Sequence, residues 1–308
     1  MNCKLLALLC CSFAACATPR AASVAPWKVD SFEVHAYDET VGQCVLAALP
    51  DARRAVALLP GLRPTGVARI DVGPFGPTEL LGYTCFFPDE PGREGQIAIA
   101  SDADSWYMTD ERVSATLAHE LTHFSLGPEW GALPAVLEEG LCNWVATRAA
   151  PGIAPEDRLC VALCVARLMG GEAAVEVVLE EHLLDVKLHR SAVCEGLAEV
   201  PEMLALGRFE LWSSRWSERA DELYALGHLL VQRIGVTRLH QLCVAARERG
   251  LELIPASEVL AAAGLPLDRP ELWWASVLAM TGTPERAGLV TWLSGSMPGF
   301  DLRLREEP

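Results

Sequence analysis

The stretch that decides the fold is residues 109–128, which read TDERVSATLAHELTHFSLGP. The threonine and the acidic pair at its start are typical of a helix N-terminus, and Gly127 precedes a proline that ends the helix. Within this helix His119 and His123 are four residues apart, so both imidazoles lie on one face. Apolar residues recur at helical spacing along the other side: Val113, Leu117, Leu121 and Phe124.

The spacing of the two histidines is that of a zinc site. Both imidazoles can bind one Zn²⁺, and Glu120 stands beside them to take a proton from the bound water. A catalytic zinc also needs a third protein ligand and an open fourth position. A carboxylate on a second helix would supply that ligand, and residues 133–141 (LPAVLEEGL), which begin ten residues after His123, hold Glu138 and Glu139.

These two segments together resemble the gluzincin metallopeptidases, the group that contains thermolysin and the zinc aminopeptidases. Many bacterial members read Leu-Pro-x-Trp-Leu-x-Glu-Gly-Leu at the second segment, and the Glu before the Gly is their third zinc ligand. On that alignment Glu139 is the ligand and the adjacent Glu138 is the alternative, while Val136 stands where the family carries Trp. The resemblance covers residues 113–148 and implies a zincin-like fold with Zn²⁺ as cofactor.

The resemblance also implies roles for residues beyond the ligands. Asn143 stands where thermolysin-like members carry an Asp that orients a zinc-bound histidine; its carbonyl could accept the same N–H bond, or it could be an ordinary helix-surface residue. Residues 221–228 (DELYALGH) resemble the Tyr-x-x-Gly pattern of the aminopeptidase branch, whose Tyr donates to the oxyanion, although Leu226 replaces the family's Lys. Tyr224 is then the donor or a half-buried helix residue, and His228, one turn on, could assist or replace it.

The N-terminus predicts export. Within residues 1–15, Lys4 supplies a positive charge and residues 5–15 form an uncharged apolar run. This run is too short to span a bilayer but fits a signal peptide. The run ends in Phe-Ala-Ala-Cys, which resembles the bacterial lipobox and implies lipidation of Cys16; ordinary cleavage near Ala17 is the alternative. Residues 16–30 then form a tether, and the lipid is the expected attachment to the membrane of the bacterial cell envelope.

Composition excludes several classes of protein. The 308 residues are 51% hydrophobic and 21% charged, which excludes a disordered or collagen-like chain. The formal net charge is −16, whereas a nucleic-acid-binding protein typically carries a positively charged surface. Seven cysteines follow Cys16, among them Cys142 and Cys243, and their spacing matches no zinc knuckle or redox motif. We expect them to be mostly buried apolar residues, with one or two disulfides allowed.

The order of elements predicts an α+β fold. A helix is expected over residues 41–59, interrupted at Pro50, and residues from 134 onward are mostly helical. This order gives a zincin-like part over residues 31–150 and a helical part over residues 151–308. Strands are expected over residues 32–37, 68–72, 82–87 and 96–100. In a zincin, the strand over residues 96–100 would form the sheet edge along which an extended substrate pairs.

Together these patterns predict a zinc-dependent metallopeptidase that hydrolyses a peptide or protein substrate in the cell envelope. One alternative is a zincin-like lipoprotein without activity that serves as a binding or assembly module. A second is a lipoprotein in which the two histidines occur by chance.

Overall fold

The computed structural model describes residues 25–63, 68–73, 82–86, 95–100, 110–153, part of 161–169, 196–213 and 220–281. The predicted signal peptide, Cys16, most of the tether and the expected cap at Thr109 lie outside these residues. The described part is mixed α+β and mostly helical, as the sequence predicts. It contains no helix that is both long and apolar enough to span a membrane.

The described strands form one five-stranded mixed sheet in the order β1-β2-β3-β5-β4. The three central strands β2, β3 and β5 are parallel, and β1 and β4 are antiparallel to their neighbours. Their bounds are β1 (Trp27–Val29), β2 (Phe32–Ala36), β3 (Ala68–Gly73), β4 (Gly82–Phe86) and β5 (Gly95–Ala100).

Two sequence predictions about the sheet are wrong. Strand β5 is not an edge strand, because β4 folds back beside it and pairs antiparallel, Thr84 opposite Ile97. An extended substrate therefore cannot pair along β5, and the edges are β1 and β4. Residues 27–29 were expected in the tether but form β1, which pairs with β2 and is joined to it through Asp30, at a φ of 51°.

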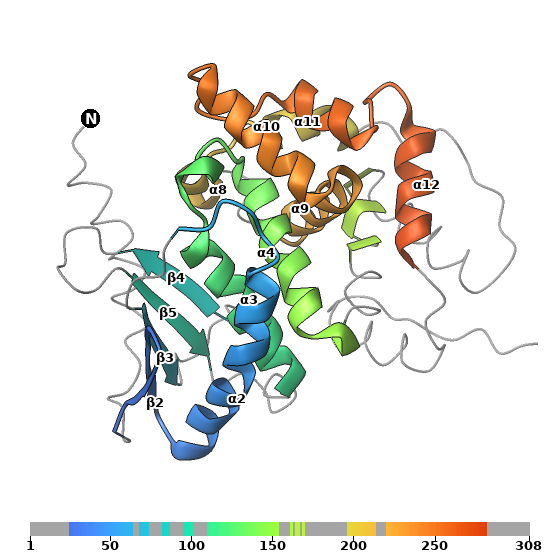
Figure 1. Ribbon diagram of the computed structural model, residues 1–308. Helices are drawn as coiled ribbons and strands as arrows, with labels where there is room; N and C mark the ends of the chain where they lie inside the picture. Colours follow the sequence, from blue (N-terminus) through green and yellow to red (C-terminus); the bar gives the residue numbers. More distant parts are fainter. Residues whose placement is uncertain are drawn as a thin grey trace, which may run out of the picture. The chain divides into compact units, whose positions relative to one another are not determined.

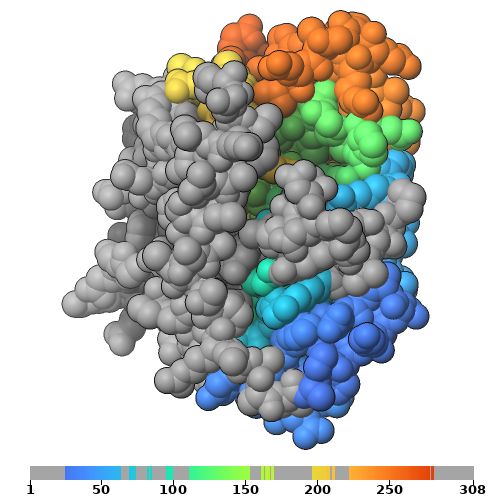
Figure 2. Space-filling model, turned by 90° about the vertical axis from the view of Figure 1, so that its left-hand side faces the viewer, coloured from blue at the N-terminus to red at the C-terminus, as the bar shows by residue number. Residues whose placement is uncertain are grey.

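One face of the sheet is covered by helices α2 (Glu39–Val56) and α3 (Asp110–Ser125), which also pack against each other (Figure 1). Asp38 caps the N-terminus of α2, and its carboxylate accepts a hydrogen bond from the Val41 N–H at 2.9 Å. The expected interruption at Pro50 is wrong, because α2 continues through this residue. The sheet contributes fully buried side chains to this core, among them Val34, Ile70 and Ile97. In the space-filling view, the blue surface of the N-terminal part of the described chain lies beside a cyan surface of residues that follow it in sequence (Figure 2).

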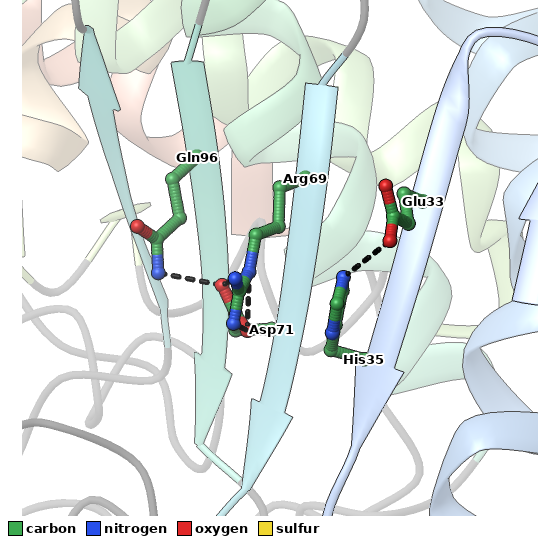
Figure 3. A network of polar contacts seen from close by, with 5 residues as sticks. All are labelled: Glu33, His35, Arg69, Asp71 and Gln96. Atoms are coloured by element: carbon green, nitrogen blue, oxygen red, sulfur yellow. Dashed lines mark hydrogen bonds and ion pairs between the residues drawn. The ribbon is translucent and has the colours of Figure 1, made fainter. Parts of the chain in front are cut away.

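The opposite face of the central strands is polar (Figure 3). Asp71, only 2% exposed, accepts hydrogen bonds from Arg69 Nε at 2.8 Å and from Gln96 Nε2 at 2.6 Å. On the neighbouring strand His35 contacts Glu33 at 3.0 Å. This alternation of apolar and polar faces explains why the sequence pattern predicts these strands.

The chain forms two compact units. The first holds residues up to Ala132 together with Leu141–Pro151 and Val236–Glu252, and the second holds Leu133–Gly140, Gly152–Gly235 and Leu253–Pro308. The remaining described helices are η2 (Pro128–Trp130), α4 (Ala135–Ala149), η3 (Pro151–Ile153), η5 (Gly196–Glu199), α7 (Val200–Met203), α8 (Arg208–Ser213), α9 (Ala220–Ile234), α10 (Val236–Glu248), α11 (Ala256–Ala263) and α12 (Pro270–Thr281).

Within the first unit, the C-terminal end of α3 is held by contacts with the loop that follows α2. A bridge joins Leu62 to Leu126, and the Trp130 indole N–H donates to the Pro60 carbonyl at 2.9 Å. Gly61 has a φ of +62°, and a Cβ there would lie 2.5 Å from the His240 ring, so this turn requires glycine. These loop contacts fix the last turn of α3, which follows the two histidines.

Candidate metal site

The imidazoles of His119 and His123 on helix α3 lie next to each other. His119 and His123 are each partly exposed, and their Nε2 atoms are 3.3 Å apart. Two nitrogens bound to one tetrahedral Zn²⁺ at about 2.0–2.1 Å would be about 3.3–3.4 Å apart. The separation of the two imidazole nitrogens therefore fits one ion.

The tautomer of His119 is set by helix α4. His119 Nδ1 lies 2.9 Å from Asn143 Oδ1, the contact that the resemblance to gluzincins implies. Because an amide oxygen only accepts hydrogen bonds, Nδ1 carries the proton and Nε2 keeps its lone pair. His123 Nε2–H can then donate to that lone pair, and a bound cation would take the place of this proton. Asn143 thus holds His119 in the form that a metal requires.

Cys142 is a third metal-binding side chain at the same place. Its Sγ and one ring nitrogen of each histidine all lie within 4.8 Å of one another. The side chain is fully buried, and the cysteine forms no disulfide. Sequence reasoning missed this residue because a Cys so far along the chain from the histidines matches no ligand spacing. Only the packing of α4 against α3 brings it there.

Glu120 is buried beside the histidines, with 6% of its surface exposed. The Thr84 hydroxyl on β4 donates to Glu120 Oε2 at 2.7 Å and also lies 3.1 Å from the Glu120 carbonyl oxygen. Thr84 carries no motif, so sequence analysis missed it; only the antiparallel return of β4 places it there. This hydrogen bond restricts the rotation of the carboxylate and leaves Oε1 for another proton.

Glu138, one of the two candidate third ligands, pairs with an arginine. Glu138 is 5% exposed and receives both arms of the Arg208 guanidinium, Nε to Oε2 at 3.0 Å and Nη2 to Oε1. An ion pair of this bidentate kind uses both carboxylate oxygens. Glu139 is also buried, at 7% exposed, and both residues belong to the second unit.

The turn of α4 that carries Glu139 packs on the backbone of α9. A Cβ on Gly140 would lie 2.0 Å from the Gly227 carbonyl carbon, and a Cβ on Gly227 would lie 1.9 Å from the Val136 carbonyl oxygen. Both positions therefore require glycine, because the two helices touch through their main chains. Gly140 therefore allows the close contact with the main chain of α9, and this contact fixes the turn of α4 that carries Glu139.

The two predicted oxyanion donors lie on α9. Tyr224 is partly exposed, whereas His228 is fully buried. The Gln232 amide nitrogen lies 2.9 Å from His228 Nε2 and donates to it, so this ring nitrogen is already engaged. The predicted residues His119, Glu120, His123 and Asn143 lie in the first unit, as does Cys142. The predicted residues Glu139, Tyr224 and His228 belong to the second unit.

Comparison of the chain with protein-family models, with curated proteins and with solved structures found no match in any of the three.

Proposed function

We propose that the chain is a zinc-dependent metallopeptidase of the gluzincin type, with Zn²⁺ held by His119, His123 and Glu139. The observation that carries the proposal is the 3.3 Å separation of the two Nε2 atoms, together with the hydrogen bond that fixes the tautomer of His119. A chance pair of surface histidines would need neither a fixed tautomer nor a buried carboxylate at the intervening position. Both features support a metal site.

The choice of Glu139 over Glu138 rests on helix geometry and on charge. Glu139 and Asn143 are four residues apart on α4, so they lie along the same face of that helix. Glu138 points about 100° away and is neutralised by Arg208. On these two grounds we propose Glu139 as the third ligand.

Zinc bound there would polarise a peptide carbonyl and make a water molecule more acidic. Glu120 would accept the proton of the attacking water on Oε1 and pass it to the leaving amine, while Thr84 keeps the carboxylate in place. Tyr224 would donate a hydrogen bond to the carbonyl oxygen as it gains charge. We favour Tyr224 over His228 because Tyr224 is partly exposed and His228 Nε2 already accepts from Gln232.

The proposed substrates are peptides or proteins of the bacterial cell envelope. The lipobox-like segment supports an exported protein that is anchored through lipid on Cys16. The net charge of −16 argues against nucleic acid as a partner.

A second candidate function is a zincin-like domain that binds metal but serves as an envelope binding or assembly module. The observation that favours it is Cys142, because a thiolate beside three other protein ligands would fill a tetrahedral zinc and leave no position for water.

The variant Glu120→Gln tests the proposal, because an amide cannot accept the proton. We expect zinc content to stay at the parent level while hydrolysis of a mixed peptide library falls about 10²–10⁴-fold. Glu111→Gln, an exposed change in the first turn of the same helix, is the matched control and should leave turnover unchanged. Zinc-loaded parent protein that cleaves nothing in the library, or Glu120→Gln within about tenfold of an active parent, would contradict the proposed peptidase.

A further inference from the structure

Cys142 has the chemistry and the position of a metal ligand. A thiolate binds Zn²⁺ at about 2.3 Å, so its sulfur would lie about 3.6 Å from a zinc-bound imidazole nitrogen. The three ligand atoms lie within 4.8 Å of one another, so no sulfur–nitrogen separation exceeds the zinc-bound distance of about 3.6 Å by more than about 1.2 Å.

The surroundings of Cys142 also favour coordination. The side chain is fully buried, and the next residue along α4, Asn143, holds His119 in the metal-binding tautomer. One helix therefore supplies both the group that orients a histidine and a thiol beside it. Thiolate is also a softer ligand than carboxylate and is well matched to zinc.

We propose that Cys142 binds, as a thiolate, the metal held by His119 and His123, and closes that site in the resting protein. The inference rests on the metal site of the proposed function and adds a ligand that the gluzincin resemblance does not contain. On coordination the thiol proton passes to solvent and an S–metal bond forms, so no oxidant is needed. With two imidazoles, the Glu139 carboxylate and the thiolate, a tetrahedral zinc is full. Turnover then requires water to displace the thiolate, so Cys142 slows hydrolysis by the zinc-loaded parent without abolishing it and acts as a regulatory group.

The test is a Co²⁺ titration of the purified full chain after removal of metal. Cobalt bound by a thiolate gives a sulfur-to-metal charge-transfer band in the near ultraviolet, whereas cobalt bound only by nitrogen and oxygen does not. We expect the parent to develop this band up to one equivalent, and Cys142→Ser to lose it and to bind cobalt at least about tenfold more weakly.

Cys243→Ser is the matched control. Cys243 belongs to the same unit, is fully buried and forms no disulfide. Burial raises the pKa of its thiol to about 12, so it is protonated and should contribute nothing to the band. An unchanged band in Cys142→Ser, or its loss in Cys243→Ser, would overturn the assignment of Cys142.

A measurement on the unmodified chain keeps the proposal testable if Cys142→Ser does not fold. X-ray absorption of the zinc-loaded parent should show one sulfur neighbour at about 2.3 Å, and a shell of nitrogen and oxygen alone would overturn the inference. The two proposals fail separately. Cobalt bound through His119 and His123 without a sulfur band contradicts only Cys142, whereas no binding of either metal contradicts the metal site itself.

Discussion

Gly140→Ala is the substitution for which the structure gives the sharpest magnitude. In an exposed helix the change would stabilise the protein by about 1 kcal/mol, because alanine has the higher helix propensity. Here the new Cβ would lie 2.0 Å from the Gly227 carbonyl carbon and 2.3 Å from its oxygen. Such atoms rarely approach within 3.0 Å, so α4 and α9 would have to separate by about 1 Å.

Overpacking of this kind costs about 3 kcal/mol when the obstacle is main chain that cannot rotate away. Subtracting the gain in propensity leaves a net loss of about 2 kcal/mol in the free energy of unfolding. With a urea dependence of about 2 kcal/mol per molar, the midpoint should fall by about 1 M.

The assay is urea unfolding followed by circular dichroism, with Gly207→Ala as the control. A Cβ on Gly207 would meet only the Glu210 carboxylate oxygen, at an ordinary 3.5 Å, so this midpoint should barely move. A Gly140→Ala midpoint at or above that of the parent would refute the backbone contact between α4 and α9.

Three further predictions test the proposed site. Glu139→Gln should weaken zinc binding at least about tenfold in a chelator titration while Glu138→Gln changes it little, and the reverse ranking would place the ligand one residue earlier. Asn143→Ala should weaken zinc binding about 10–100-fold by freeing the His119 ring; parental affinity would remove Asn143 from that role. Tyr224→Phe should lower kcat about 10²–10³-fold with KM and zinc content near parental, and a parental kcat would dismiss Tyr224.

Much of the sheet was predictable, because its strands alternate apolar and polar residues. Strands β2 to β5 lie within a residue or so of the expected ranges. The order of the strands was not predictable in the same way, since pairing is decided by long-range packing. The expected edge at residues 96–100 is internal because β4 returns beside it. Residues 27–29 resembled a tether because three residues are too few to show a strand pattern.

Residue spacing alone predicted only the part of the candidate site whose residues lie close together in sequence, and the resemblance to gluzincins added the contact of His119 with Asn143. His119 and His123 are related by one turn of helix, so their shared face follows from spacing alone. Thr84 and Cys142 reach the same place only through packing, and neither carries a local signal. Arg208 is a third case, because its pairing with Glu138 joins residues 70 positions apart and bears on the choice between the two candidate glutamates.

The most direct test of the central claim is the zinc content of the purified chain after reconstitution and removal of loosely bound metal. We predict about one zinc per chain for the parent and less than about 0.2 for His119→Ala and for His123→Ala, since each variant lacks one of the two imidazoles. His240→Ala removes a histidine that pairs with Glu129 in the same unit, so it should keep the parental zinc content. A parent chain with less than about 0.2 zinc, or histidine variants that keep a full equivalent, would contradict the metal site at His119 and His123.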